Sequence, residues 1–133
     1  MSADVVYLDT SAAVKLVIRE AETAALRSTL RRWPRRASSS LLRLELLRAV
    51  RRAGLPQLVV QARRELGAVQ LVRIDDALLD RAIALDPPRL RSLDAIHLAT
   101  ALALGADLGM VVTYDARMVE AAASLGLPVS SPS

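Results

Sequence analysis

The segment VVYLDTS, residues 5–11, decides how the rest of the sequence is interpreted. Its first four residues are apolar and rich in β-branched side chains, which is typical of a short buried strand. The strand is expected to stop at Asp9, and Thr10 or Ser11 is expected to cap a helix that follows at once. A buried strand that leads directly into a helix is the step from which α/β folds are built.

Strands and helices continue to alternate along the chain. Ser40 and Ser92 are expected to cap two of the helices, and glycine or proline closes several of them. The other expected strands are 37–39, 70–74, 109–113 and 127–130. The expected helices are 11–19, 22–33, 41–53, 57–67, 75–85, 93–104 and 116–125. The alternation predicts an α/β fold in which helices cover both faces of a parallel sheet.

The composition is that of one folded domain. A chain of 133 residues with 53% hydrophobic side chains and a mean hydropathy of +0.30 can bury a real core. The absence of cysteine excludes disulfides and thiolate metal sites, and it favours a reducing compartment such as the cytoplasm. There is no uncharged apolar run of the roughly 18 residues that a membrane span needs, so no membrane span is expected.

The net charge of +4 is unevenly distributed along the chain. Residues 31–73 contain eleven arginines and two acidic residues, which is a local charge of +9. The remaining residues contain seven basic and twelve acidic residues, which is a charge of −5. A basic stretch of this kind is typical of proteins that bind a phosphate backbone, but a solvated helical surface rich in arginine has the same composition.

Four acidic residues stand at positions where an α/β fold places chemistry. Asp9 and Asp115 each follow directly on an apolar strand, and ligands bind at the carboxyl ends of parallel strands. Asp94 lies in the first turn of an expected helix, and Glu45 lies among leucines on the inward side of another. Because an inward carboxylate needs a proton or a cation, the four together predict a metal site. Oxygen ligands without cysteine suit Mg²⁺ or Mn²⁺ rather than Zn²⁺.

Each acid also has a purely structural interpretation. Asp9 and Asp115 stand where a helix cap or turn residue is common, and Asp94 is placed to interact favourably with a helix dipole. Glu45 could pair with a neighbouring arginine on a half-exposed helix face. His97, one helical turn after Asp94, is interpreted as a structural histidine, with a hydrogen bond to Asp94 or a catalytic role as the alternatives.

Four stretches carry a resemblance to a known family: VVYLDTS, SSSLLRLELLRA, RSLDAIHLATAL and GMVVTYDARM. They are similar to the four acidic motifs of PIN domains, and most closely to those of the VapC toxins of bacterial toxin–antitoxin pairs. The similarity extends from Val5 to about Val129. It implies a three-layer α/β/α sandwich with a central parallel sheet, and it implies that residues 1–133 form a single PIN domain.

The resemblance also implies a function. A VapC-like chain hydrolyses RNA with Mg²⁺ or Mn²⁺, forms a two-fold homodimer and is inhibited by a cognate VapB-type antitoxin. The residues that the resemblance assigns to catalysis and to the metal are Asp9, Glu45, Asp94 and Asp115. The residues that it makes polar neighbours, which orient a carboxylate or bind water at the site, are Thr10, Ser11 and Thr113.

Two surfaces complete these expectations. Arg51 and Arg52 are expected to contact the RNA backbone. An apolar surface for the second subunit or the antitoxin is expected at Leu26, Leu30, Leu58 and Val59. The alternative of a different class is a non-catalytic, arginine-rich α/β module that binds RNA or an acidic protein, with carboxylates that serve only the structure.

Overall fold

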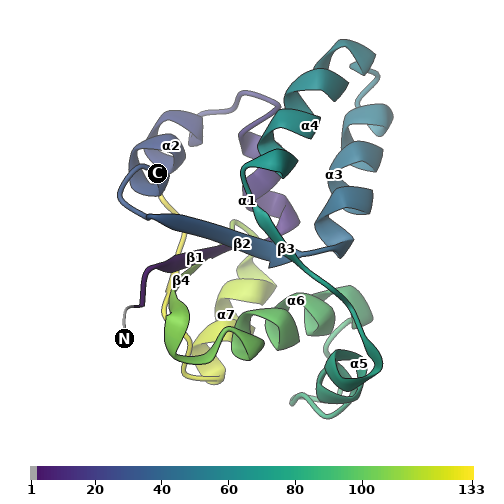
Figure 1. Cartoon of the computed structure of the whole chain (residues 1–133), viewed down its shortest axis with the longest axis vertical. Coiled ribbons are helices and arrows are strands. Elements are labelled where there is room, and N and C mark those ends of the chain that lie inside the picture. The colour runs from purple at the N-terminus through teal and green to yellow at the C-terminus, as the bar shows by residue number, and fades with distance from the viewer. Residues whose placement is uncertain (1–2) are drawn as a thin grey trace.

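The computed structural model describes residues 3–133, and it has one central sheet with helices on both sides (Figure 1). The five strands are arranged in the order β3-β2-β1-β4-β5, and every neighbouring pair is parallel. The strands are β1 (Val5–Leu8), β2 (Arg35–Ser39), β3 (Gln70–Val72), β4 (Leu108–Val112) and β5 (Val129–Ser130). The predicted three-layer α/β/α sandwich with a central parallel sheet is confirmed.

The two layers of helices come from the two halves of the chain (Figure 1). One layer holds α1 (Thr10–Lys15), α2 (Thr23–Leu30), α3 (Leu41–Arg52) and α4 (Val59–Gly67), with the short 3₁₀ helix η1 (Pro56–Leu58) before α4. The other holds α5 (Asp76–Ile83), α6 (Ser92–Ala103) and α7 (Ala116–Ser124), with η2 (Gly105–Asp107) after α6. No helix within residues 3–133 has the length and apolar character to cross a membrane.

The strand order explains this division. From β1 the chain first proceeds outward to β2 and β3, and it later returns to β4 and β5 on the other side of β1. Right-handed crossovers that proceed in opposite directions place their helices on opposite faces of a sheet. The strand order therefore reverses between β1 and β4, and at such a reversal a crevice opens beyond the carboxyl ends of the strands.

The core forms on both faces of β1, none of whose residues is more than 2% exposed. Val6 and Leu8 pack into one apolar cluster, and Tyr7 packs into another, because alternate strand residues point to opposite faces. The first cluster includes Leu26 and Leu30, which are 0% and 1% exposed. The expectation that these two leucines form part of a partner surface is therefore wrong.

Several ends of helices differ from the sequence-based expectation. α1 stops at Lys15, whose carbonyl accepts a hydrogen bond of 2.8 Å from the hydroxyl of Thr23. Ser40 precedes α3 without a capping side-chain bond, and the neighbouring Ser39 hydroxyl accepts from the Leu41 amide instead. α6 begins at Ser92 itself, so the expected cap at that residue is wrong. Local caps are interchangeable within a residue or two, which is why sequence patterns place them poorly.

Gly109 provides a test of the packing between β1 and β4. The register between these strands shifts at Val5 and Val6, which leaves Gly109 unpaired between Leu108 and Met110. A Cβ atom at Gly109 would overlap the ring of Trp33 and the carbonyl oxygen of Ala3.

We therefore expect Gly109→Ala to lower the free energy of unfolding by about 1–3 kcal/mol, as in other overpacked sites. Urea unfolding followed by the fluorescence of Trp33, the only tryptophan of the chain, measures this directly. Gly67→Ala is the matched control, because apart from the chain neighbours of Gly67 and the backbone of its own helix no atom lies within 4 Å of the added Cβ. Equal stabilities of the two variants would contradict the packing described here.

Candidate active site

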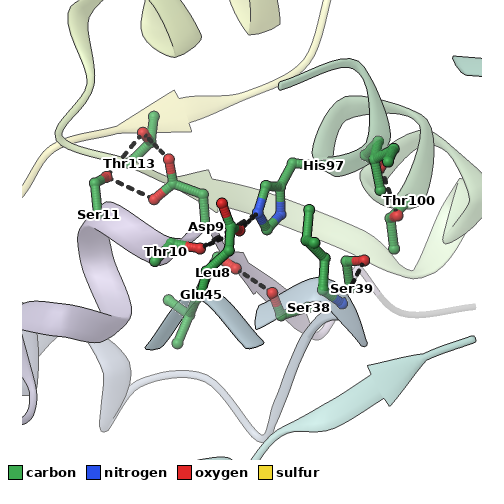
Figure 2. A network of polar contacts seen from close by, with 12 residues as sticks. Leu8, Asp9, Thr10, Ser11, Ser38, Ser39, Glu45, His97, Thr100 and Thr113 are labelled. Carbon is green, nitrogen blue, oxygen red and sulfur yellow. Dashed lines mark hydrogen bonds and ion pairs between the residues drawn. The ribbon is translucent and has the colours of Figure 1, made fainter. Parts of the chain in front are cut away.

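The acidic motifs singled out in the sequence lie at the carboxyl ends of β1 and β4 and in the first half of α3 and of α6. Asp9 follows β1 directly, and Asp115 follows β4 after two intervening residues. Glu45 and Asp94 lie near the starts of α3 and α6. Figure 2 shows Asp9 and Glu45 at this edge, each within its own group of hydrogen-bonding side chains.

Asp9 is a buried carboxylate, 4% exposed, that acts as the N-cap of α1. Its Oδ1 accepts hydrogen bonds from the Ser11 hydroxyl at 2.6 Å and from the Ala12 amide at 3.1 Å. Its Oδ2 accepts from the Thr113 hydroxyl. Burial raises the pKa of Asp9 above its ordinary value, although these three bonds oppose the rise. The helix cap expected at Thr10 or Ser11 is thus Asp9 itself.

Ser11 and Thr113 connect the Asp9 group to β4. Their hydroxyls lie 3.2 Å apart, and the Ser11 hydroxyl accepts from the backbone amide of Tyr114 at 2.8 Å. The Thr113 hydroxyl accepts from the Asp115 amide at 3.2 Å. Thr113 therefore joins the end of β1 to the loop that carries Asp115.

Glu45 belongs to a second group, with residues from three other elements. Its Oε1 lies 2.6 Å from the donating hydroxyl of Thr10 and 2.8 Å from Nε2 of His97. Nδ1 of His97 lies 2.6 Å from the hydroxyl of Tyr7 in β1. Burial raises the pKa of Glu45, but the contacts with His97 and Thr10 outweigh it, so that the net pKa is lowered.

These contacts decide between the alternatives left by the sequence. Within residues 3–133, Glu45 makes its side-chain contacts with His97 and Thr10, and not with Arg43 or Arg48. His97 is buried, as a structural histidine would be, but its hydrogen bonds go to Glu45, Tyr7 and Thr10 rather than to Asp94. The alternative of a hydrogen bond to Asp94 is wrong, because the ring of His97 is directed at β1 and α3.

Asp94 and Asp115 form the third part of the site. Burial raises the pKa of Asp94, and the negative charge of Asp115 raises it further. Asp115 caps α7, with Oδ1 2.9 Å from the Arg117 amide. It therefore has the structural role of a helix cap in addition to its predicted role at the site. Arg91 and Arg117 lower the pKa of Asp94 through their charges.

Arg91 and Arg117 were not among the residues predicted from the sequence. With Arg89 they line a cavity that also includes Asp94. They lie outside the basic stretch 31–73, and no local pattern connects them to it. The available signal was their position in the sequence, because Arg91 lies close to Asp94 and Arg117 lies close to Asp115.

The four acids do not close around an ion as their side chains stand. Within residues 3–133, no three Asp, Glu or His side chains are grouped closely enough to hold a metal. Asp9 and Glu45 turn their oxygens toward hydroxyl, amide and imidazole partners, which stabilise the charges separately. Four uncompensated carboxylates repel one another, so such separate stabilisation is the expected arrangement without a cation.

Comparison with known proteins identifies the family. The PIN domain matches residues 6–124. The chain belongs to the PIN-domain family. Ribonuclease VapC46 of Mycobacterium tuberculosis is 50% identical to this PIN domain, over 96% of this chain and 98% of that protein. The resemblance to VapC-type PIN domains is therefore confirmed.

Two solved structures share the fold of this PIN domain. VapC20 of Mycobacterium tuberculosis, described as a toxin that cleaves the sarcin–ricin loop, superposes with a TM-score of 0.73 at 17% identity, over 96% of this chain and 99% of that one. A toxin–antitoxin complex from Klebsiella pneumoniae gives 0.72 at 22%, over 96% of this chain and 98% of that one.

The burial of Asp9 yields a prediction about stability. Because the folded pKa of Asp9 is raised, the folded state favours the protonated form, and stability is lost as pH rises from the unfolded pKa near 4. Asparagine does not ionise and remains a good helix cap. We expect Asp9→Asn to unfold at a higher urea concentration than the wild type at pH 7 in EDTA.

The difference should shrink at acid pH, where Asp9 is protonated. Asp80→Asn, on an exposed helix face, serves as the control and should change little. A variant less stable than the wild type at pH 7 in EDTA would show that the hydrogen bonds to Asp9 outweigh its burial.

Proposed function

We propose that this PIN domain is a toxin ribonuclease that hydrolyses phosphodiester bonds of RNA at Asp9, Glu45, Asp94 and Asp115. The observation that carries the proposal is the geometry of Asp9, a buried carboxylate at the end of β1 that is held by donors from α1 and from the residue after β4. The raised pKa values of Asp9 and Asp94 support it. Carboxylates whose surroundings oppose their ionisation are typical of functional sites. The name of the 50% identical relative, a ribonuclease, supports the same activity.

Mg²⁺ or Mn²⁺ is the proposed cofactor. The donor chemistry fits, because the four acids offer only oxygen atoms and the chain has no cysteine. Burial of Asp9 and the mutual repulsion of Asp94 and Asp115 are both relieved by a cation. When bound, such an ion supplies Lewis-acid stabilisation of the charge on the phosphodiester.

The other residues of the site hold and surround these acids. Ser11 and Thr113 fix the two oxygens of Asp9. Thr10 fixes Oε1 of Glu45. Arg91 and Arg117, beside Asp94, supply positive charge where a phosphate group would enter.

A metal assay with one variant tests the proposal. We expect wild-type protein to cleave RNA in the presence of Mn²⁺ and to lose this activity in EDTA. Asp9→Asn should reduce cleavage by at least 100-fold, because it removes a charge from the metal site while the cap and the fold remain.

Asp80→Asn is the charge-matched control and should cleave normally. The alternative of a non-catalytic, arginine-rich module would be favoured if Asp9→Asn behaved like the wild type in the RNA assay and if Mn²⁺ made no difference to either protein. That module would bind RNA or an acidic protein equally well with either variant.

The arginines proposed to bind RNA are Arg51 and Arg52, and the fold separates them from much of the basic stretch. α3 starts at the carboxyl edge of the sheet, where Glu45 lies, and Arg52 is two helical turns further along the same helix face. Arg51 lines a groove between α3 and α4. Arg31 and Arg32, by contrast, lie just before β2 at the opposite, amino edge.

This separation supplies a matched pair of variants. Neutralising Arg51 and Arg52 to glutamine should weaken RNA binding and lower the slope of log affinity against log salt by about 1–2 units. Neutralising Arg31 and Arg32 removes the same charge at the opposite edge and should leave the slope nearly unchanged. Equal effects of both pairs, measured by filter binding at several salt concentrations, would mean that only net charge matters.

A VapB-type antitoxin and a second copy of the chain are the proposed partners. The Klebsiella neighbour is a toxin–antitoxin complex, which supports the first. For the second, Leu58 and Val59 are only partly buried, and Leu44 and Val60 nearby are 59% and 62% exposed. A sedimentation mass of 14.3 kDa at micromolar concentration would contradict the dimer.

A further inference from the structure

The buried contact between Tyr7, His97 and Glu45 joins three elements that are distant in the sequence. Tyr7 lies in β1, His97 in α6 and Glu45 in α3, and the two contacts bridge 90 and 52 residues of chain. Tyr7 is 0% and His97 4% exposed. Figure 2 shows the His97 ring directed at Glu45 beside Thr10.

We propose that His97 is a positioning residue, which donates from Nε2 to Oε1 of Glu45 while the Tyr7 hydroxyl donates to Nδ1 and fixes the tautomer of the ring. These two hydrogen bonds through His97 are called the relay. The proposal rests on the function proposed above, because the relay would hold Glu45 in position to bind the metal.

The chemistry of the partners sets the direction of both hydrogen bonds. A carboxylate oxygen only accepts, and Oε1 of Glu45 already accepts from the Thr10 hydroxyl, so the proton between Glu45 and His97 belongs to Nε2. Burial raises the pKa of Tyr7 far above its usual range, so the phenol keeps its proton. In a neutral ring with its proton on Nε2, Nδ1 has only a lone pair, so it accepts from the Tyr7 hydroxyl 2.6 Å away.

The relay decides how Glu45 is presented. Oε1 receives both the Thr10 hydroxyl at 2.6 Å and Nε2 of His97 at 2.8 Å. Oε2 has no hydrogen-bond partner within the part of the chain that the structure describes. The carboxylate is thus held by one oxygen and offers the other, and its rotation about the side-chain axis is restricted from two directions.

The position of His97 gives the relay a second consequence. Asp94 stands on the same helix, one turn earlier, so the hydrogen bond from His97 ties the acid on α3 to the helix that carries another acid. Residues that hold a metal ligand in this way typically change metal affinity by about 10–100-fold when they are mutated.

The tautomer can be measured without metal or RNA. His97 is the only histidine of the chain, so a long-range ¹H–¹⁵N spectrum of untagged, ¹⁵N-histidine-labelled protein in EDTA shows a single ring. We expect a proton on Nε2 and none on Nδ1 at neutral pH. Tyr7→Phe should produce a mixture of states. A proton on Nδ1 of the wild type, or an unprotonated Nε2, would overturn the relay.

The positioning role is measured by Mn²⁺ affinity in electron paramagnetic resonance titrations. We expect His97→Leu to weaken Mn²⁺ binding by about 10–100-fold, and His97→Gln to recover most of it, since the glutamine amide donates from nearly the place of Nε2. Thr23→Val is the control: it removes a buried hydroxyl remote from the site, and it should lower stability without any change in affinity.

The outcomes separate the two proposals. Wild-type Mn²⁺ affinity in His97→Leu, or no recovery in His97→Gln with its fold intact, would overturn the positioning role. Absence of Mn²⁺ binding by the wild type would instead sink the metal site proposed above. The tautomer measured in EDTA would then decide the relay by itself.

Discussion

The carboxylate of Asp9 is the constraint on which the rest of the structure depends. It stands at the end of a strand that is buried on both faces, where a charge loses most of its hydration. Hydrogen bonds to a charged group contribute about 1.5–3 kcal/mol each, whereas burial of a charge costs several kcal/mol. The three bonds to Asp9 offset part of this penalty, and its raised pKa shows that burial still prevails.

Meeting this constraint organises the crevice. The donors to Asp9 come from the first turn of α1 and from the residue that follows β4, so the ends of the two central strands are held together by the polar group that they surround. The strand order reverses between β1 and β4, and the edge beyond such a reversal is where parallel α/β sheets commonly bind ligands. The buried carboxylate, which is unfavourable for stability, stands at this edge.

The surroundings of Glu45 shift its pKa in the opposite direction from that of Asp9. Its contacts lower its pKa where burial alone would raise it, whereas Asp9 and Asp94 stay raised. Burial therefore resists the ionisation of Asp9 and Asp94, whereas the contacts of Glu45 favour its ionisation. Arg91 and Arg117 reduce this resistance at Asp94 without pairing fully with it.

The sequence by itself determined the fold class, and it singled out the four acids that we propose for the metal site, because both follow from local patterns. An apolar run before Asp9, another before Asp115 and regular helices after them specify strand ends within a few residues. The tertiary structure alone decided which acid meets which partner. The contacts of His97 with Tyr7 and Glu45 span 90 and 52 residues, and helical spacing suggested only its neighbour Asp94.

The same limit applies to the surfaces. Nothing in the sequence distinguishes Leu26 and Leu30 as core residues rather than interface residues. Their packing against the sheet shows that they belong to the core. The arginines of residues 31–73 form one block in the sequence, but the chain crosses the sheet along β2 between Arg35 and Ser39. Arg31 and Arg51 therefore line different cavities, because the path of the chain sets where each charge lies.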